Sequence, residues 1–182
     1  MNPLRIFLLA ALVLVVFSSN GAEATEVKEP KWSDTTPEHH VNKIAISADG
    51  EYIVAGGWHT GLISLYDRRD STQLWERSFG HKVKSVAISA DGEYIFAGLE
   101  SDDVHFFNKN SSTPLWSVDR NGYSAQSVAI SADGVYMVSG SAHSDGGDIH
   151  FYNASRANEP NLKDAEWSYG FNEYVMSVSI SA

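Results

Sequence analysis

The sequence predicts an all-β protein that is built from repeated four-stranded units. The first observation is a repeated phrase, because "KIAISADGEYI" at residues 43–53 recurs as "SVAISADGEYI" at 85–95 and as "SVAISADGVYM" at 127–137. The Asp-Gly pairs inside this phrase recur every 42 residues. The second observation is composition, since a chain with 43% hydrophobic and 12% aromatic residues can bury a core and is not disordered. A fixed period of this length indicates a repeat architecture.

The segments inside each repeat have the pattern of short β-strands, which we name a to d in chain order. Strands a and b, such as "VAIS" and "EYIVAG", are joined by the Asp-Gly pair, a strong hairpin signal because Gly accepts positive φ. Strand c reads "LISLYD", "VHFFN" and "DIHFYN", and strand d reads "QLWERSF", "PLWSVD" and "EWSYGF". Strand b is almost continuously apolar, which predicts that both of its faces are covered.

Four-stranded units that stack face to face are typical of the blades of a β-propeller, whereas a β-solenoid usually has shorter coils. Two pieces of the repeat stand outside the complete units. Trp32 lies nine residues before Val41, as Trp116 lies nine before Ala125, and "SVSISA" at 177–182 repeats the start of strand a. The expected fold is therefore a partial β-propeller, with three four-stranded antiparallel blades, an N-terminal d strand and the first strand of a fourth blade.

This interpretation divides the chain into six segments. They are a signal peptide at 1–24, an N-terminal segment with the lone d strand at 25–40, blade 1 at 41–82, blade 2 at 83–124, blade 3 at 125–174 and the start of a truncated blade 4 at 175–182. Blade 3 carries an insertion between Asn153 and Trp167. Because a closed ring needs at least about four blades and this chain has three complete units, we expect the N-terminal part of a longer protein. The alternative is a chain that closes by self-association.

The first 24 residues have the pattern of a secretory signal peptide. Arg5 precedes an unbroken apolar run at 6–17, and Ala22-Glu23-Ala24 offers the small residues that signal peptidase accepts. An uncleaved membrane anchor is the alternative, but this run is shorter than the ~20 residues that span a bilayer as a helix. We therefore expect a mature chain that starts near Thr25 and is secreted, periplasmic or on the cell surface.

The repeat resembles two families of propeller repeats. "VAISADGEYIVAGG" is similar to the WD repeat, and "LYDRRDSTQLW" is similar to the quinoprotein-like repeat. The resemblance implies a binding or assembly scaffold, or else the N-terminal fragment of a quinoprotein-like dehydrogenase or another propeller enzyme. The Gly-His pair that opens a WD repeat is present once, as Gly80-His81, and the chain has no cysteine pair to lie over a quinone. We therefore expect no cofactor.

Charge narrows the classes of partner. The formal net charge is -10, which repels phosphate backbones and anionic lipid, so we expect neither nucleic-acid binding nor peripheral-membrane binding. Removal of the signal peptide also leaves no stable membrane insertion to be expected. The expected partner is a protein or a carbohydrate, and a truncated chain is expected to self-associate.

The expected ligand-binding face is the one that carries the d-to-a and b-to-c loops, because the repeats differ there and share "SADG" on the other face. The candidate residues are Trp58, His59, His81, Tyr123, His143, Asp145 and Asp148. Trp58 is either an exposed aromatic anchor for a sugar or peptide or a side chain that packs on the next blade.

Metal binding and catalysis are not favoured. The loop "HSDGGDIH" offers oxygen and nitrogen ligands, but it matches no complete calcium-loop motif and also fits a tight Gly-rich hairpin. His105 and His150 occupy equivalent strand-c positions and are expected to be structural. The serine of "ISADG" is present in every repeat, which indicates a turn former rather than a nucleophile. We expect no catalytic residue.

Overall fold

A computed structural model describes residues 32–33, 40–69, 72–101, 104–119, 124–156 and 165–181. These residues all belong to one compact unit, Trp32–Ala182. The predicted signal peptide and the candidate residue Tyr123 lie outside the described residues.

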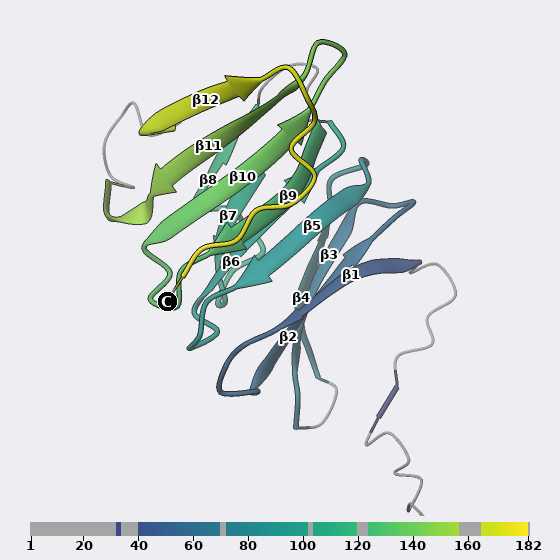
Figure 1. Ribbon diagram of the computed structural model, residues 1–182. Coiled ribbons are helices and arrows are strands. Elements are labelled where there is room, and N and C mark those ends of the chain that lie inside the picture. Colours follow the sequence, from purple (N-terminus) through teal and green to yellow (C-terminus); the bar gives the residue numbers. More distant parts are fainter. Residues whose placement is uncertain are drawn as a thin grey trace, which may run out of the picture. The chain divides into compact units, whose positions relative to one another are not determined.

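The described residues form three four-stranded sheets, which correspond to the three predicted blades (Figure 1). Blade 1 consists of β1 (Val41–Ile46), β2 (Tyr52–Gly57), β3 (Leu62–Asp67) and β4 (Gln73–Ser78). Blade 2 consists of β5 (Val83–Ile88), β6 (Tyr94–Leu99), β7 (Val104–Asn108) and β8 (Trp116–Val118). Blade 3 consists of β9 (Ser124–Ile130), β10 (Tyr136–Ala142), β11 (Gly147–Asn153) and β12 (Trp167–Phe171).

Each sheet is an antiparallel meander in which sequential strands are neighbours, so strands a to d are confirmed in all three repeats. The second strands, β2, β6 and β10, are largely buried, as their apolar sequences predict. The insertion of the third repeat begins with a short 3-10 helix, η1 (Ala154–Arg156). No α-helix occurs in the described part of the chain, which accordingly contains no helix long and apolar enough to cross a bilayer.

Apolar side chains from adjacent blades close the space between them. We call the side of a blade that contacts the following blade its front, and the opposite side its back. Between blades 1 and 2 the buried cluster comprises Val54, Ile63, Leu65, Val83, Val86, Ile95, Ala97 and Phe107. Between blades 2 and 3 it comprises Phe96, Val104, Phe106, Val118, Ala125, Val128, Met137 and Tyr152. Burial of each larger side chain contributes about 1.5–3 kcal/mol, so these two interfaces supply much of the stability.

The recurring tryptophan links each blade to the next. The Trp75 indole of β4 packs on Phe107 of blade 2, with ring centroids 5.4 Å apart, and its Nε1 donates to the Lys109 carbonyl at 2.7 Å. Trp32 makes the same two contacts with blade 1, since it stacks on Tyr66 at 5.9 Å and donates to the Arg68 carbonyl at 2.9 Å. Trp32 therefore occupies the position of a d-strand tryptophan that precedes blade 1.

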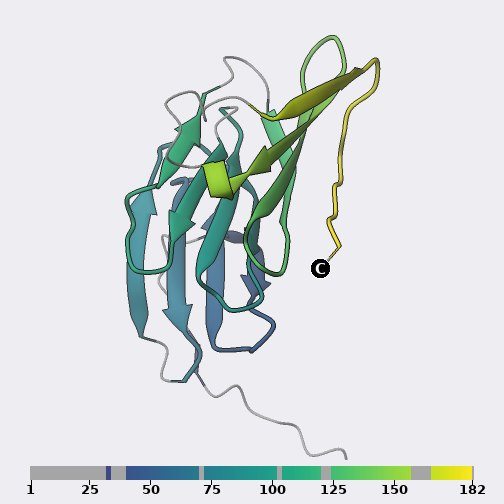
Figure 2. The same ribbon diagram turned by 90° about the vertical axis from the view of Figure 1, so that its left-hand side faces the viewer.

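Neither of the two single strands expected at the ends is present as a strand in the residues that the structure describes. Trp32 and Ser33 have no strand conformation, and residues 34–39 lie outside the described residues. Residues 175–181 form no strand either, and their trace runs on from β12 without an arrow (Figure 2). The physical reason is that a strand needs a hydrogen-bonded neighbour, and no described strand pairs with this segment.

Residues 175–181 nevertheless lie where the first strand of a following blade would begin. The Val178 amide donates to Ser127 Oγ at 3.1 Å, as the Val128 amide of β9 donates to Ser85 Oγ at 3.0 Å. The repeated sequence "SV" thus makes the same contact with the preceding blade at both places.

Candidate binding surfaces

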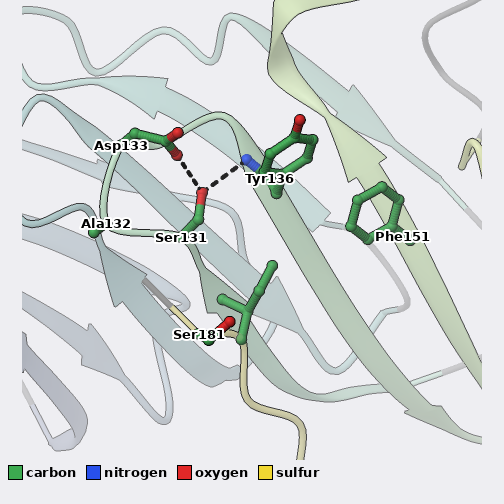
Figure 3. Close-up of a pocket in the computed structure, with 7 residues that line it drawn as sticks. Ser131, Ala132, Asp133, Tyr136, Phe151 and Ser181 are labelled. Atoms are coloured by element: carbon green, nitrogen blue, oxygen red, sulfur yellow. Dashed lines mark hydrogen bonds between the residues drawn. The ribbon is translucent and has the colours of Figure 1, made fainter.

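The a-to-b turns form the same hydrogen-bonded structure in each blade. In blade 3, Ser131 Oγ donates to Asp133 Oδ1 at 2.6 Å and accepts from the Tyr136 amide at 2.9 Å (Figure 3). Asp133 Oδ1 also accepts from the Val135 amide at 3.0 Å. These donors, the Ser131 hydroxyl first, lower the pKa of Asp133. The serine hydroxyl and the aspartate carboxylate both make their hydrogen bonds within the turn, so the interpretation of "SADG" as a structural phrase is supported.

The same bonds hold the other two turns. Ser89 donates to Asp91 at 2.7 Å, and Ser47 donates to Asp49. The pKa of Asp49 is also lowered, mainly by the Ser47 hydroxyl and then by the Glu51 amide. A face made of three identical, internally satisfied turns offers little that could distinguish one ligand from another.

The opposite face carries the loops that differ between repeats. Between β2 and β3, Gly61 has a φ of +62°, and a Cβ there would lie 2.1 Å from the His81 carbonyl oxygen. The b-to-c loop of blade 1 therefore packs directly on the backbone of the following d-to-a loop. This contact brings Trp58 and His59 to the same face as His81, which is exposed.

Trp58 lies at the centre of a cationic and aromatic group on this face. The Lys82 and Lys84 ammonium groups lie 5.0 and 5.4 Å from the centre of its ring. The His40 and His59 rings meet edge to face at 4.7 Å, and the Trp58 amide donates to the His40 carbonyl at 2.8 Å. We call these five residues the Trp58 cluster.

The surroundings of Trp58 support one of the two interpretations that the sequence left open for this tryptophan, packing on the next blade. Its ring is half-buried and contacts Lys84 of β5, so it does pack on the next blade. His59 and His40 stay exposed beside it. The sequence singled out Trp58 because it stands outside the repeat, but it did not reveal the two lysines, which lie in the loop before β5 and in β5.

The histidines and aspartates of the third b-to-c loop lie near each other without forming a metal centre. Asp148 Oδ2 lies 4.0 Å from His143 Nε2 and 3.8 Å from His150 Nε2. Asp145 is exposed at the tip, where its amide donates to His143 Nδ1 at 3.2 Å. No group of three or more His, Cys, Asp or Glu side chains within the described ranges could hold a metal ion. The loop is a short hairpin closed by paired His143 and Gly146.

His105 is a buried side chain at the interface between blades 1 and 2. It is 6% exposed and stacks on Phe79 with ring centroids 4.1 Å apart, and its Nδ1 lies 2.6 Å from Ser117 Oγ. Burial, and then the nearby Arg77, lower the pKa of His105 to about 4. It is therefore neutral at physiological pH and acts in packing, as its position in strand c predicted.

A pocket that sequence reasoning missed lies on the front of blade 3. It has a volume of about 390 Å³ and is lined by Ser131, Ala132, Asp133, Tyr136, Phe151, Ile180 and Ser181 (Figure 3). Tyr136 stacks on Phe151 at 5.6 Å, and Phe151 stacks on Trp167 at 5.5 Å. Tyr136 and Trp167 are 41% and 52% exposed. The signal in the sequence was the repeat itself, since the tyrosine and the tryptophan recur in blades 1 and 2 and the phenylalanine recurs in blade 2.

Comparisons with known proteins agree with this geometry. The family model described as "WD domain, G-beta repeat" (WD40) matches residues 31–67 and 74–108. The first match begins beside Trp32 and ends with β3, and the second begins in β4 and ends with β7. Each match therefore runs from a d-strand position through strands a to c, which supports the assignment of Trp32 to a d position.

Solved structures show the same fold. The chain is similar to the crystal structure of the RRP9 WD40 repeats, with a TM-score of 0.65 and 14% sequence identity over 80% of this chain and 43% of that one. It is similar to the structure of U3-55K, with a TM-score of 0.66 and 14% identity over 80% of this chain and 44% of that one. No match was found among curated protein sequences.

The chain spans less than half the length of these two solved structures. Its three sheets do not close into a ring. The described residues therefore have the fold of WD40 repeats and form part of a β-propeller.

Proposed function

We propose that the protein is an exported protein-interaction scaffold that binds an acidic protein segment through the face formed by its d-to-a and b-to-c loops. The single observation that carries the proposal is the Trp58 cluster. It gathers two lysines, two histidines and an aromatic ring on a chain whose formal net charge is -10. A local group of cations with an amphipathic ring is suited to carboxylates and their neighbouring apolar atoms.

The charges of the cluster are only partly compensated within the blade array. Lys82 Nζ pairs with Glu100 Oε1 at 2.9 Å, and 35% of the Lys82 side chain is exposed. Lys84 makes no ion pair with any residue that the structure describes. A partner carboxylate therefore has one unpaired ammonium to bind, next to a ring already fixed by cation–π contacts.

The opposite face supplies a matched control. There, Lys109 Nζ lies over the Tyr52 ring at 4.8 Å and pairs with Glu93. This pair raises the pKa of Lys109, mainly through the hydrogen bond to Glu93. The same kind of cation–π contact thus exists on a face whose a-to-b turns are identical, where no selective binding is expected.

The experiment compares three probes by isothermal titration calorimetry: a glutamate-rich peptide, a lysine-rich peptide of equal length and a neutral oligosaccharide. We expect binding of the glutamate-rich peptide alone, weakening as salt is raised. Trp58→Ala and Lys84→Ala should each weaken it about tenfold, and Lys109→Ala should leave it unchanged. Binding of the oligosaccharide alone, or equal effects of the three variants, would contradict the proposal.

Export is tested separately. The protein recovered outside the cytoplasm should begin near Thr25, because Ala22 and Ala24 provide the small residues before that point. N-terminal sequencing that still finds Arg5 in the exported protein would show that no signal peptide is removed.

A further inference from the structure

The front of blade 3 is an uncovered copy of a surface that is covered twice in this chain. In blade 2 the stacked rings of Tyr94, Phe106 and Trp116 correspond to Tyr136, Phe151 and Trp167 of blade 3. Blade 3 packs on the three rings of blade 2. Among the described residues, only part of the segment 175–181 lies on the three rings of blade 3, where Ile180 and Ser181 line the pocket beside Tyr136.

The covering element in each internal interface is an Asp-Gly turn of the next blade. A Cβ on Gly92 would lie 2.3 Å from the Tyr52 ring, and a Cβ on Gly134 would lie 2.5 Å from the Tyr94 ring. Only glycine allows this approach, and both glycines have a φ of +72°. The tyrosine at the start of strand b is therefore the side chain on which the Asp-Gly turn of the next blade packs. Tyr136 is the equivalent tyrosine of blade 3, and no described glycine turn packs on it.

The back of blade 1 is the matching surface, where Trp32 packs on Tyr66 but β1 remains exposed among the described residues. Gly50 has a φ of +70°, and a Cβ there would meet no described atom within 4 Å, unlike a Cβ on its counterparts in blades 2 and 3. Val41, Ile44 and Ile46 of β1 are 50%, 68% and 55% exposed. The residues equivalent to the first two in β5 are Val83 and Val86, which are 0% and 9% exposed because blade 1 covers them.

We propose that these two surfaces bind each other between two copies of the chain, head to tail. Tyr136 of one copy packs on Gly50 of the next, and Val41 and Ile44 of that copy approach Gly140 as Ala125 and Val128 approach Gly98. The occupant is a second copy because the chain itself carries both halves of an interface that it already builds twice.

Backbone groups at the turns support the same docking. The Asp49 amide donates to the Ala90 carbonyl at 3.3 Å, and the Ala90 amide donates to the Ala132 carbonyl at 2.9 Å. The a-to-b turns of successive blades are thus joined in series. Ala132 lines the pocket beside Tyr136, and Ala48 is exposed on blade 1, so the series continues from Ala132 of one copy to Ala48 of the next.

Residues 175–181 on blade 3 and Trp32 on blade 1 must move for this contact to form. In each case an equivalent residue of the other copy takes the vacated position. Residues 175–181 hold their place by the Val175 amide on the Ser141 carbonyl and the Val178 amide on Ser127 Oγ. Val41 and Ile44 of the second copy would replace Val175 and Val178. On blade 1, Trp167 of the first copy would replace Trp32.

Each contact that is lost within one copy is therefore replaced by an equivalent contact with the other copy. It adds burial of Ile46, of Phe151 and of the Tyr136 ring, which the segments leave exposed or half-exposed. Because the contact is heterologous, two copies can close on each other or further copies can extend the array.

The experiment measures molar mass by light scattering coupled to size exclusion over a wide concentration range. We expect the purified chain to associate, and Tyr136→Ala to weaken association about tenfold or more, whereas Tyr136→Phe, which keeps the ring, should not. Gly50→Ala should weaken it as strongly. Gly80→Ala is the matched control, since Gly80 has a φ of +75° and open space around it but lies on the other loop face.

A mixing experiment separates head-to-tail binding from any other association. The Tyr136→Ala variant keeps an intact back of blade 1, and the Gly50→Ala variant keeps an intact front of blade 3. We expect each to be monomeric alone and the mixture to form a one-to-one heterodimer. The proposal would be overturned if the unchanged chain were monomeric at all concentrations, if neither substitution weakened association, or if the mixture formed no heterodimer.

Discussion

The fronts of blades 2 and 3 carry the same residue types and have different surroundings. Phe106 is 1% exposed between Tyr94 and Trp116, with ring centroids 5.3 and 5.4 Å away. Phe151 has the same two kinds of ring on either side but is only half-buried. The local sequence and register are alike, since Phe106 pairs with Trp116 and Phe151 pairs with Trp167.

The difference shows that burial in a repeat array comes from the next repeat and not from the repeat itself. A blade cannot cover its own front, so stability is the sum of blade terms and interface terms. Equivalent substitutions at covered and uncovered positions should therefore have unequal costs, and the following measurements test this.

The largest expected effect is at the aromatic stack. Phe106→Ala should lower the free energy of unfolding by about 3–5 kcal/mol, because it leaves a cavity between two blades. Phe151→Ala should cost only about 1 kcal/mol in the monomer, since part of its ring is already in water. Urea unfolding at low protein concentration, followed by circular dichroism, measures both. Equal losses would show that the front of blade 3 is covered as well as that of blade 2.

The second effect is a pH dependence that originates in the covered interface. Folded protein keeps His105 neutral down to a pKa of about 4, whereas the unfolded chain binds a proton below about pH 6.5. The unfolded state therefore binds more protons in this window, and stability falls as pH is lowered from about 6.5 to about 4. The loss from this group should reach roughly 3 kcal/mol.

The control for this pH effect is His105→Gln, which stays neutral at every pH and keeps a polar group that can hydrogen-bond to Ser117 Oγ. Its unfolding free energy should fall less steeply between pH 6.5 and 4 than that of the unchanged chain, and other acidic groups cancel in the comparison. Parallel pH profiles for the two proteins would mean that the imidazole is charged in the fold.

The smallest effect compares two glycine turns. Gly134→Ala and Gly50→Ala share the strain of a positive φ, about 1 kcal/mol, because their φ values are +72° and +70°. Only Gly134 lies against a tyrosine ring, so its variant should lose about 1–2 kcal/mol more. Thermal unfolding of the two monomeric variants measures the difference. If both lost the same amount, the fit of Gly134 to Tyr94 would contribute nothing.

Most of the fold could be predicted from the sequence because its signals are local and repeated. The Asp-Gly pairs and the apolar runs between them place every strand of the three blades, and the structure confirms the order of the strands in each sheet. The end segments could not be predicted in the same way. "SVSISA" has the sequence of a first strand, yet residues 175–181 form none, since strand formation depends on a partner strand elsewhere.

The candidate binding face was predicted less completely. The odd position of Trp58 pointed to this face, but its partners Lys82 and Lys84 are 24 and 26 residues away in the sequence, in the loop before β5 and in β5 itself. Their spacing from Trp58 follows no local period, so only the packing of one blade on the next brings them together.

The sequence by itself determined the β-strands, the turns that join them, the length of the repeat and the tryptophan that links each blade to the next. These features depend on side-chain alternation, on turn chemistry and on contacts that every repeat duplicates. The tertiary structure alone decided which copies of a repeated surface are covered and which distant side chains share a face. Tyr94 and Tyr136 have nearly the same neighbours in the sequence, but Gly134 packs on Tyr94 and no described glycine turn packs on Tyr136, because coverage is a property of position in the array.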